Sequence, residues 1–132
     1  MDKKEEPILV CSENKPNLDM LSGILAGEGY KVESISEFAG LKTYLEKIQA
    51  KTFHALILNI DPARTDTPFL KKMLYESTRY QPVIVIAKSG NLELEREIRA
   101  EEIFYYFVEP VDKDEFREVV REALRWYYKD FI

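Results

Sequence analysis

Short apolar runs alternate with segments of helical periodicity along the chain. Four runs rich in aliphatic or aromatic residues predict strands over 8–11, 55–60, 83–86 and 104–108. A fifth segment, 31–35, alternates polar and apolar residues, which predicts a strand with one wet face or a strand at the sheet edge. Strands 8–11, 55–60 and 83–86 are nearly continuous apolar runs, which is typical of the centre of a parallel sheet.

A helix is predicted after each of these strands. The first helix is expected to start near Asn14 and to end at Gly27–Gly29, and the second is expected to start at Ser36 as N-cap. The third is expected to start with Thr67 as N-cap and Pro68 at its first position. The fourth is the charged segment 92–102, and the last starts with Asp112 and Glu115 as a capping box. The expected inward faces are Leu18, Leu21 and Leu25; Phe38, Leu41, Leu45 and Ile48; Leu70, Met73 and Leu74; Leu94 and Ile98; and Phe116, Val119, Val120, Ala123, Leu124, Tyr127 and Phe131.

Five strand–helix units in strict alternation imply an α/β fold with a parallel sheet and helices on both faces. Residues 1–6 are expected to form a tail and residues 7–132 a single domain. In such a sheet, chemistry lies beyond the carboxyl ends of the strands. The segments to consider are therefore 11–14, 59–64, 87–90 and 109–110.

Composition narrows the function classes. The chain has 132 residues, of which 45% are hydrophobic and 33% charged, and its net charge of −5 argues against a general nucleic-acid or anionic-membrane binder. The single Cys11 and single His54 exclude a disulfide framework, a multi-thiolate zinc site and a His-rich metal centre. No apolar run reaches the ~20 residues that cross a bilayer, and no signal-peptide pattern is present, so a cytoplasmic domain is expected.

A dinucleotide or Walker-type nucleotide site is excluded by the loop after the first strand. A phosphate cradle needs glycines so that backbone N–H groups can approach the oxygens. The loop Ser12–Pro16 contains no glycine and carries an acidic residue, and neither a Gly-x-Gly-x-x-Gly nor a Gly-Lys-Ser/Thr motif occurs. The residues point to no cofactor.

The arrangement resembles the receiver domain of two-component response regulators over about residues 7–126. The segments that carry the resemblance are Ile8-Leu9-Val10, Asn17-Leu18 through Glu28-Gly29-Tyr30-Lys31-Val32, Ala55 to Ile60, Pro82 to Ile86, and Tyr106-Phe107-Val108-Glu109-Pro110-Val111-Asp112. The resemblance implies a (βα)5 flavodoxin-like, doubly wound sheet of five parallel strands in the order 2-1-3-4-5. It also implies a role in two-component signal transduction or a phosphorelay.

The residues that carry out phosphoryl transfer in this family are replaced here. The resemblance places the Mg²⁺-binding acidic pair at Ser12 and Glu13, so one carboxylate remains, and places the phospho-acceptor aspartate at Asn59. A neutral carboxamide is too weak a nucleophile to accept a phosphoryl group. Any Mg²⁺ site, reduced to Glu13 and Asp61, is expected to be weak.

The remaining family positions are also altered. The hydroxyl position falls on Ala87, and the lysine position falls on Glu109, which reverses the charge beside an incoming phosphoryl group. Pro110 is retained, and a cis peptide before it is expected as in the family. The sequence therefore predicts a degenerate receiver, or pseudo-receiver, without the standard phosphorylation switch.

Several residues of this degenerate pocket have two interpretations. Asn59 is either a locked mimic of the phosphorylated side chain or a polar residue that has drifted. Asp61 is either a displaced acceptor or ion ligand, or a solvated loop acid. Glu13 and Glu109 are expected to converge on one pocket and to pair with Lys88 or Arg64. Outside the pocket, Cys11 is expected in the core and His54 on the surface.

A second feature is the abundance of aromatic and arginine residues near the C-terminus, which are enriched at protein interfaces. The expected interface residues are Phe104, Tyr105, Tyr106, Phe107, Arg121, Arg125, Trp126 and Tyr128. The charged helix 92–102 would be its polar rim, with Glu93, Glu95 and Glu97 facing arginines across the interface. The alternative is that these aromatics fold back on their own domain.

The leading hypothesis is a non-enzymatic signalling module that acts by protein–protein contact, with a partner or as a homodimer, and without aspartyl phosphorylation. An output domain, fused or separate, is compatible with this hypothesis, whereas direct nucleic-acid or membrane binding is not expected. Two alternatives remain open. One is a small-molecule-binding pseudo-receiver, and the other is a receiver phosphorylated at Asp61.

Overall fold

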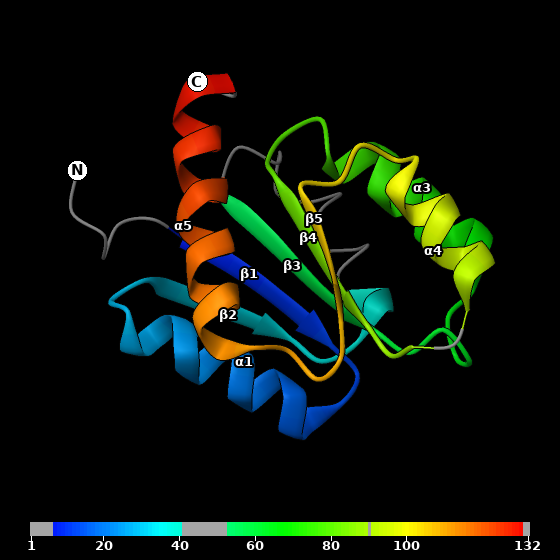
Figure 1. The fold of residues 1–132 in the computed structure, drawn as a ribbon, viewed down its shortest axis with the longest axis horizontal. Helices are drawn as coiled ribbons and strands as arrows, with labels where there is room; N and C mark the ends of the chain where they lie inside the picture. The colour runs from blue at the N-terminus through cyan, green and yellow to red at the C-terminus, as the bar shows by residue number, and fades with distance from the viewer. Residues whose placement is uncertain (1–6, 41–52, 90, 131–132) are drawn as a thin grey trace.

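The computed structural model describes residues 7–40, 53–89 and 91–130. Five parallel strands form one sheet in the order β2-β1-β3-β4-β5, as the sequence predicts (Figure 1). The strands are β1 (Pro7–Ser12), β2 (Lys31–Ile35), β3 (Ala55–Ile60), β4 (Val83–Ala87) and β5 (Tyr105–Val108). The helices are α1 (Lys15–Gly27), α3 (Thr67–Ser77), α4 (Leu92–Arg99) and α5 (Lys113–Asp130).

The helices cover both faces of the sheet. Figure 1 shows α1 and α5 on one side of the strands and α3 and α4 on the other. Two core clusters match this division, one joining the sheet to α1 and α5, and one joining it to α3 and α4. Each large apolar side chain buried in these clusters contributes about 1.5–3 kcal/mol. In the described part of the chain, no helix is both long and apolar enough to cross a membrane.

The strand patterns are explained by position in the sheet. Every residue of β3 and β4 is buried, as expected of central strands covered on both faces. β2 pairs with β1 alone and none of its residues is fully buried, so the prediction of an edge strand there is confirmed. β5 pairs with β4 alone and forms the other edge.

Element boundaries differ slightly from those predicted. Asp66, not Thr67, caps α3, because its Oδ1 accepts a hydrogen bond of 3.2 Å from the backbone N–H of Phe69. The charged fourth helix ends at Arg99 instead of residue 102, and Glu102 takes a positive φ of 61°. In the predicted second helix, residues 38–40 are helical, and the rest of it lies outside the described residues, as do the 1–6 tail and Phe131.

Candidate functional site

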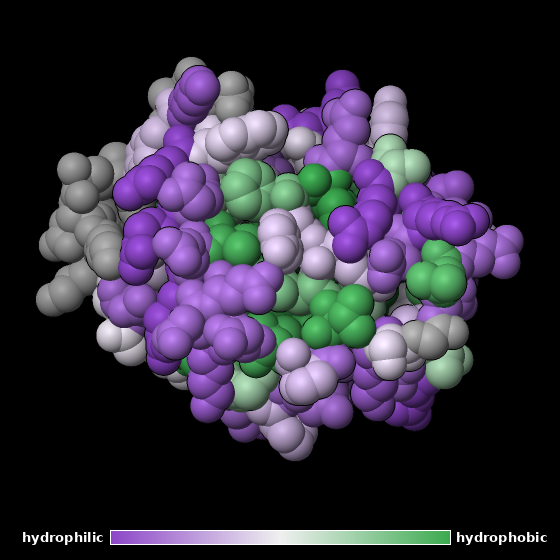
Figure 2. All heavy atoms as spheres, viewed as in Figure 1, coloured by the Kyte–Doolittle hydropathy of each residue, from purple (hydrophilic) through white to green (hydrophobic). Residues whose placement is uncertain are grey.

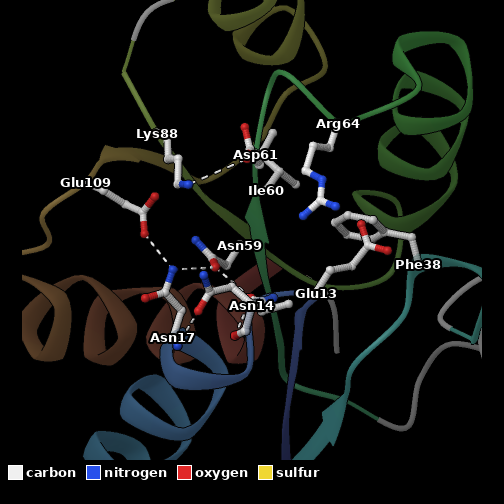
Figure 3. A pocket seen from close by; sticks show the side chains of 11 residues that line it. Glu13, Asn14, Asn17, Phe38, Asn59, Ile60, Asp61, Arg64, Lys88 and Glu109 are labelled. Carbon is white, nitrogen blue, oxygen red and sulfur yellow. Dashed lines mark hydrogen bonds and ion pairs between the residues drawn. The ribbon is translucent and has the colours of Figure 1, made fainter.

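The carboxyl ends of β1, β3, β4 and β5 open into one cavity of about 350 Å³. Figure 3 shows its polar lining, which is drawn from every strand-end loop that the sequence singled out. The lining residues are Ser12, Glu13, Asn14, Asn17, Phe38, Asn59, Ile60, Asp61, Arg64, Lys88 and Glu109. Glu13, Asp61 and Glu109 therefore do share one pocket, as predicted.

Asn59 lies at the floor of this cavity and is fixed by hydrogen bonds. Its side chain is 4% exposed. Its Oδ1 accepts hydrogen bonds from the Ser12 hydroxyl, at 2.6 Å, and from Asn17 Nδ2, at 3.1 Å. Its Nδ2 donates to the backbone carbonyl of Ile86, at 3.2 Å. These contacts satisfy a buried amide, so the side chain is held in one orientation.

The first turn of α1 connects this amide to the loop after β5. Asn14 caps α1 by accepting from the backbone N–H of Asn17, which places the Asn17 side chain over the strand ends. Asn17 Nδ2 then donates to Glu109 Oε1 at 2.7 Å, besides its bond to Asn59. Ser12, Asn59, Asn17 and Glu109 therefore form one continuous hydrogen-bonded chain.

Glu109 occupies the place that the resemblance gives to a lysine. Its backbone N–H donates to the carbonyl of Ala87 at 2.9 Å, which extends the β4–β5 ladder by one residue. The peptide between Glu109 and Pro110 is cis, as predicted. Ala87, at the end of β4, is fully buried and offers the cavity no hydroxyl.

The ion pairs of the site differ from those predicted. Lys88 Nζ lies 3.6 Å from Asp61 Oδ2, while the other Asp61 oxygen accepts from the backbone N–H of Ala63. Among the described residues, neither Glu13 nor Glu109 forms an ion pair with Lys88 or Arg64, so that expectation is wrong. The reason is local: Asp61 lies at the end of β3, next to the β4 end that carries Lys88.

The residues at the magnesium position do not fit a tight Mg²⁺ site, which needs several free oxygens in near-octahedral geometry. The Ser12 hydroxyl donates to Asn59, and the Asp61 carboxylate is shared between Lys88 and a backbone N–H. Glu13 is exposed. Among the described residues, no group of three or more His, Cys, Asp or Glu side chains is arranged to hold a metal ion.

Cys11 and His54 lie away from this chemistry. Cys11 is fully buried in β1, as predicted, and burial, with a smaller contribution from Glu13, raises the pKa of its thiol to about 12. His54, which was expected on the surface, is half-buried. Its ring stacks on Tyr127 at 4.2 Å between centroids, its Nδ1 lies 3.2 Å from the Tyr128 hydroxyl, and burial lowers its pKa.

The expected interface residues fall into two groups. Tyr106 and Phe107 are 7% and 5% exposed, so their assignment to a contact surface is corrected. Phe107 packs on Phe116 of α5, and the Arg99 guanidinium lies over the Tyr106 ring at 4.9 Å. Both side chains are buried because helices cover the two faces of this edge strand.

Tyr128 also folds back on its own domain, through the contact with His54. Phe104 is half-buried against Trp126, whose ring centroid lies 5.4 Å away. Tyr105, Arg121, Arg125 and Trp126 remain exposed. The two arginines of this group lie near acids of their own domain: Arg125 contacts Glu122, and Arg121 approaches Glu28.

An exposed face nevertheless exists where the sequence placed it. Figure 2 shows apolar side chains along the β5 edge between the polar surfaces of α5 and α4. The exposed large hydrophobic residues on these elements are Tyr105, Val108, Trp126 and Leu92. Val108 was missed as a surface residue, because an apolar residue in a strand is expected by default to point inward. Leu92 was not among the inward residues expected of its helix, but it was not assigned to the interface either.

Comparison with solved structures identifies the fold. A CheY-like receiver domain from Methanospirillum hungatei superposes with a TM-score of 0.77 at 22% identity, covering 95% of this chain and 98% of that chain. A receiver domain from Clostridium thermocellum gives 0.76 at 20% identity, covering 92% and 95%. NtrX from Brucella abortus, solved with ATP, gives 0.75 at 20% identity over 94% of this chain, which spans 28% of the NtrX chain.

Comparisons of the sequence with protein-family models and with curated proteins find no match. The likeness therefore comes from the structure, whose five parallel strands run in the order β2-β1-β3-β4-β5. The chain has the five-stranded parallel fold of CheY-like receiver domains.

Proposed function

We propose that this domain is a non-enzymatic, cytoplasmic signalling module that acts by protein contact and does not use aspartyl phosphorylation. The observation that carries the proposal is the state of Asn59. At the acceptor position stands a neutral amide whose oxygen and nitrogen are both engaged, with Ser12, Asn17 and Ile86. An amide nitrogen is not nucleophilic, because its lone pair is delocalised into the carbonyl.

The surroundings of Asn59 also oppose phosphoryl transfer. That reaction depends on cations that neutralise the transferred group. The nearest group at the position of the family lysine is the carboxylate of Glu109, and the described cation at the β4 end, Lys88, already contacts Asp61. A dianion bound beside Asn59 would therefore lie next to the Glu109 carboxylate, at a cost of a few kcal/mol at an effective dielectric constant of about 20. The other cation of the lining, Arg64, lies across the cavity from Glu109 (Figure 3).

The exposed surface formed by α4, β5 and α5 supports the proposal that this face contacts another protein. Tyr105, Val108 and Trp126 are 38%, 44% and 50% exposed, and polar helices frame them (Figure 2). An apolar strip with a charged rim is typical of protein interfaces. The proposed occupant is a second copy of the chain or a partner protein, and a fused or separate output domain would respond to this contact.

The absence of phosphorylation is tested by intact mass after incubation with acetyl phosphate and Mg²⁺. Wild type and Asp61→Asn are both expected to keep their original mass. A gain of one phosphoryl group by wild type, lost in Asp61→Asn, would establish the displaced acceptor Asp61 and overturn the proposal.

The proposed face is tested by the mass of the assembly in solution. Val108→Lys places a charge in the middle of the apolar strip, and Tyr75→Lys is a matched control on α3, where Tyr75 is 61% exposed. Light scattering after gel filtration should show a dimer, or binding to a partner, that Val108→Lys abolishes and Tyr75→Lys preserves. Equal assembly in both variants would exclude this face.

A further inference from the structure

A second cavity lies at the amino ends of β4 and β5, at the opposite end of the sheet from Asn59. It is bounded by the loops that lead into these two strands and by the C-terminal half of α5 (Figure 1). Its volume is about 470 Å³, which is within the range of small-ligand sites. The described residues that line it are Thr78, Gln81, Pro82, Glu102, Ile103, Phe104 and Trp126.

Two aromatic rings form one corner of this cavity. The ring centroids of Phe104 and Trp126 lie 5.4 Å apart, and the ring planes meet at 70°. Trp126 is 50% exposed, so its ring is only partly covered by the domain itself. The electron-rich faces of aromatic rings attract cations, and tryptophan does so most strongly. A corner between two nearly perpendicular rings is therefore suited to an organic cation.

The charge of the lining points to the same class of ligand. Among the described lining residues, Glu102 is the only charged one. Within the described part of the chain, its carboxylate has neither an ion pair nor a hydrogen bond, and the residue is exposed. Its φ of 61° lies in the left-handed region, where glycine is the usual residue, so the backbone does not explain a glutamate at this position. The cavity thus attracts a cation and repels an anion.

We propose that this cavity receives the side chain of an arginine carried by a partner protein. The guanidinium would stack in the corner between Phe104 and Trp126 and donate hydrogen bonds to the Glu102 carboxylate. A guanidinium is planar and weakly hydrated, stacks on aromatic rings and presents several donors to a carboxylate, whereas a lysine ammonium is a compact, strongly hydrated charge. Arginine and tryptophan are also among the residues that contribute most to binding at protein interfaces.

This inference rests on the proposed function, because Trp126 belongs both to the cavity and to the apolar strip of the proposed contact face. The net charge of −5 favours a basic partner over a second copy of the chain, which carries the same negative charge. The arginines of α5 also lie within 4.0 Å of acids of their own domain; they are Arg117, Arg121 and Arg125.

The test is a fluorescence titration of the full chain at constant ionic strength. Trp126 is the only tryptophan of the chain, so its emission reports directly from the cavity wall. The probe is N-acetyl-arginine amide, which presents the side chain as a peptide does. It should change the emission saturably in the millimolar range, because a molecule of this size has few atoms with which to bind.

Two analogues separate charge from shape. N-acetyl-citrulline amide has the shape of the arginine probe without its charge, and N-acetyl-lysine amide has the charge without the planar group. Each should bind at least about threefold more weakly than the arginine probe. Equal binding of the citrulline analogue would exclude recognition of a cation, and equal binding of the lysine analogue would exclude a guanidinium site.

Two variants test the contact with the carboxylate. Glu102→Gln should weaken binding of the arginine probe at least about threefold, since it removes the partner of the guanidinium. Glu101→Gln is the matched control: it removes the same charge from the adjacent residue, which does not line the cavity, and should leave binding unchanged. Equal weakening by both variants would indicate general electrostatics instead of a specific contact.

Three other results would also overturn the inference. One is the absence of any saturable change with the arginine probe. Another is tighter binding of free L-arginine than of the blocked probe, which would assign the cavity to a small molecule. The third is self-assembly that Glu102→Gln abolishes, which would assign the arginine to a second copy of the chain. The proposed function is tested separately, by intact mass and by Val108→Lys, and neither measurement uses this cavity.

Discussion

Replacing Asn59 by aspartate is expected to destabilise the domain, although it restores the acceptor residue of the receiver family. The amide Nδ2 now donates to the carbonyl of Ile86 at 3.2 Å. A carboxylate oxygen in that place faces the carbonyl oxygen without a proton between them. The lost hydrogen bond costs about 1 kcal/mol.

The new negative charge also interacts with Glu109. Asn17 Nδ2 bridges the two side chains with bonds of 3.1 and 2.7 Å. The two acidic oxygens therefore lie within about 6 Å of each other, where like charges repel by about 3 kcal/mol at an effective dielectric constant of about 20. Because Glu109 is half-exposed, solvent and salt reduce this to about 1–3 kcal/mol. The total destabilisation of Asn59→Asp is then about 2–4 kcal/mol at neutral pH.

The dependence on pH has a definite sign. Burial and Glu109 raise the pKa of the new carboxyl in the folded state above its unfolded value of about 3.9. The destabilisation therefore grows as the pH rises above about 4, and it fades as the pH falls toward that value, because a protonated carboxyl can donate to Ile86 as the amide does.

Urea unfolding followed by circular dichroism measures these changes. Glu109→Gln should recover about 1–3 kcal/mol in the Asn59→Asp background, and much less in wild type. The reasoning is refuted if Asn59→Asp is as stable as wild type at neutral pH, or if Glu109→Gln has the same effect in both backgrounds.

Three further predictions concern residues outside this chain of hydrogen bonds. Cys11, whose thiol has a pKa of about 12 and is fully buried, should resist a thiol-specific reagent in the folded protein at pH 8 and react once urea unfolds it; rapid labelling of the native state would contradict its burial. Burial lowers the pKa of His54 in the folded state, so as the pH falls His54 is protonated in the unfolded chain before it is protonated in the folded one. The free energy of unfolding should therefore decrease as the pH drops below about 6.5, and His54→Gln should reduce this dependence on pH. Asp66→Ala removes the N-cap of α3 and should lower the free energy of unfolding by about 1 kcal/mol, whereas Thr67→Ala, which does not provide the cap, should cost less.

Most of the fold could be predicted because each strand has a distinct hydrophobic pattern. The continuous apolar runs of β3 and β4 indicate central strands, and the alternation in β2 indicates an edge. The misplaced N-cap of α3 shows the limit of this approach. Asp66 and Thr67 are both good caps, and only the three-dimensional course of the loop decides which side chain reaches the Phe69 N–H.

The candidate site could be predicted in location but not in its bonding. Parallel strand ends meet at one edge, so Ser12, Asn59 and Glu109 were expected together. The part played by Asn17 was missed, because in the sequence it is one polar residue in the first turn of a helix. Its link to Glu109 spans 92 positions and depends on how α1 lies over the strand ends. The same holds for His54, whose partners Tyr127 and Tyr128 come from the far end of the chain.

The central claim is that this cavity cannot accept a phosphoryl group, and a comparison of intact masses tests it most directly. Wild type would be incubated with acetyl phosphate and Mg²⁺ beside a variant that restores the family pattern through Ser12→Asp, Asn59→Asp, Ala87→Thr and Glu109→Lys. Wild type is predicted to keep its mass, as is Asn59→Asp alone, because Glu109 and Ala87 still leave the transferred charge uncompensated. A phosphoryl group found on wild type would contradict the account.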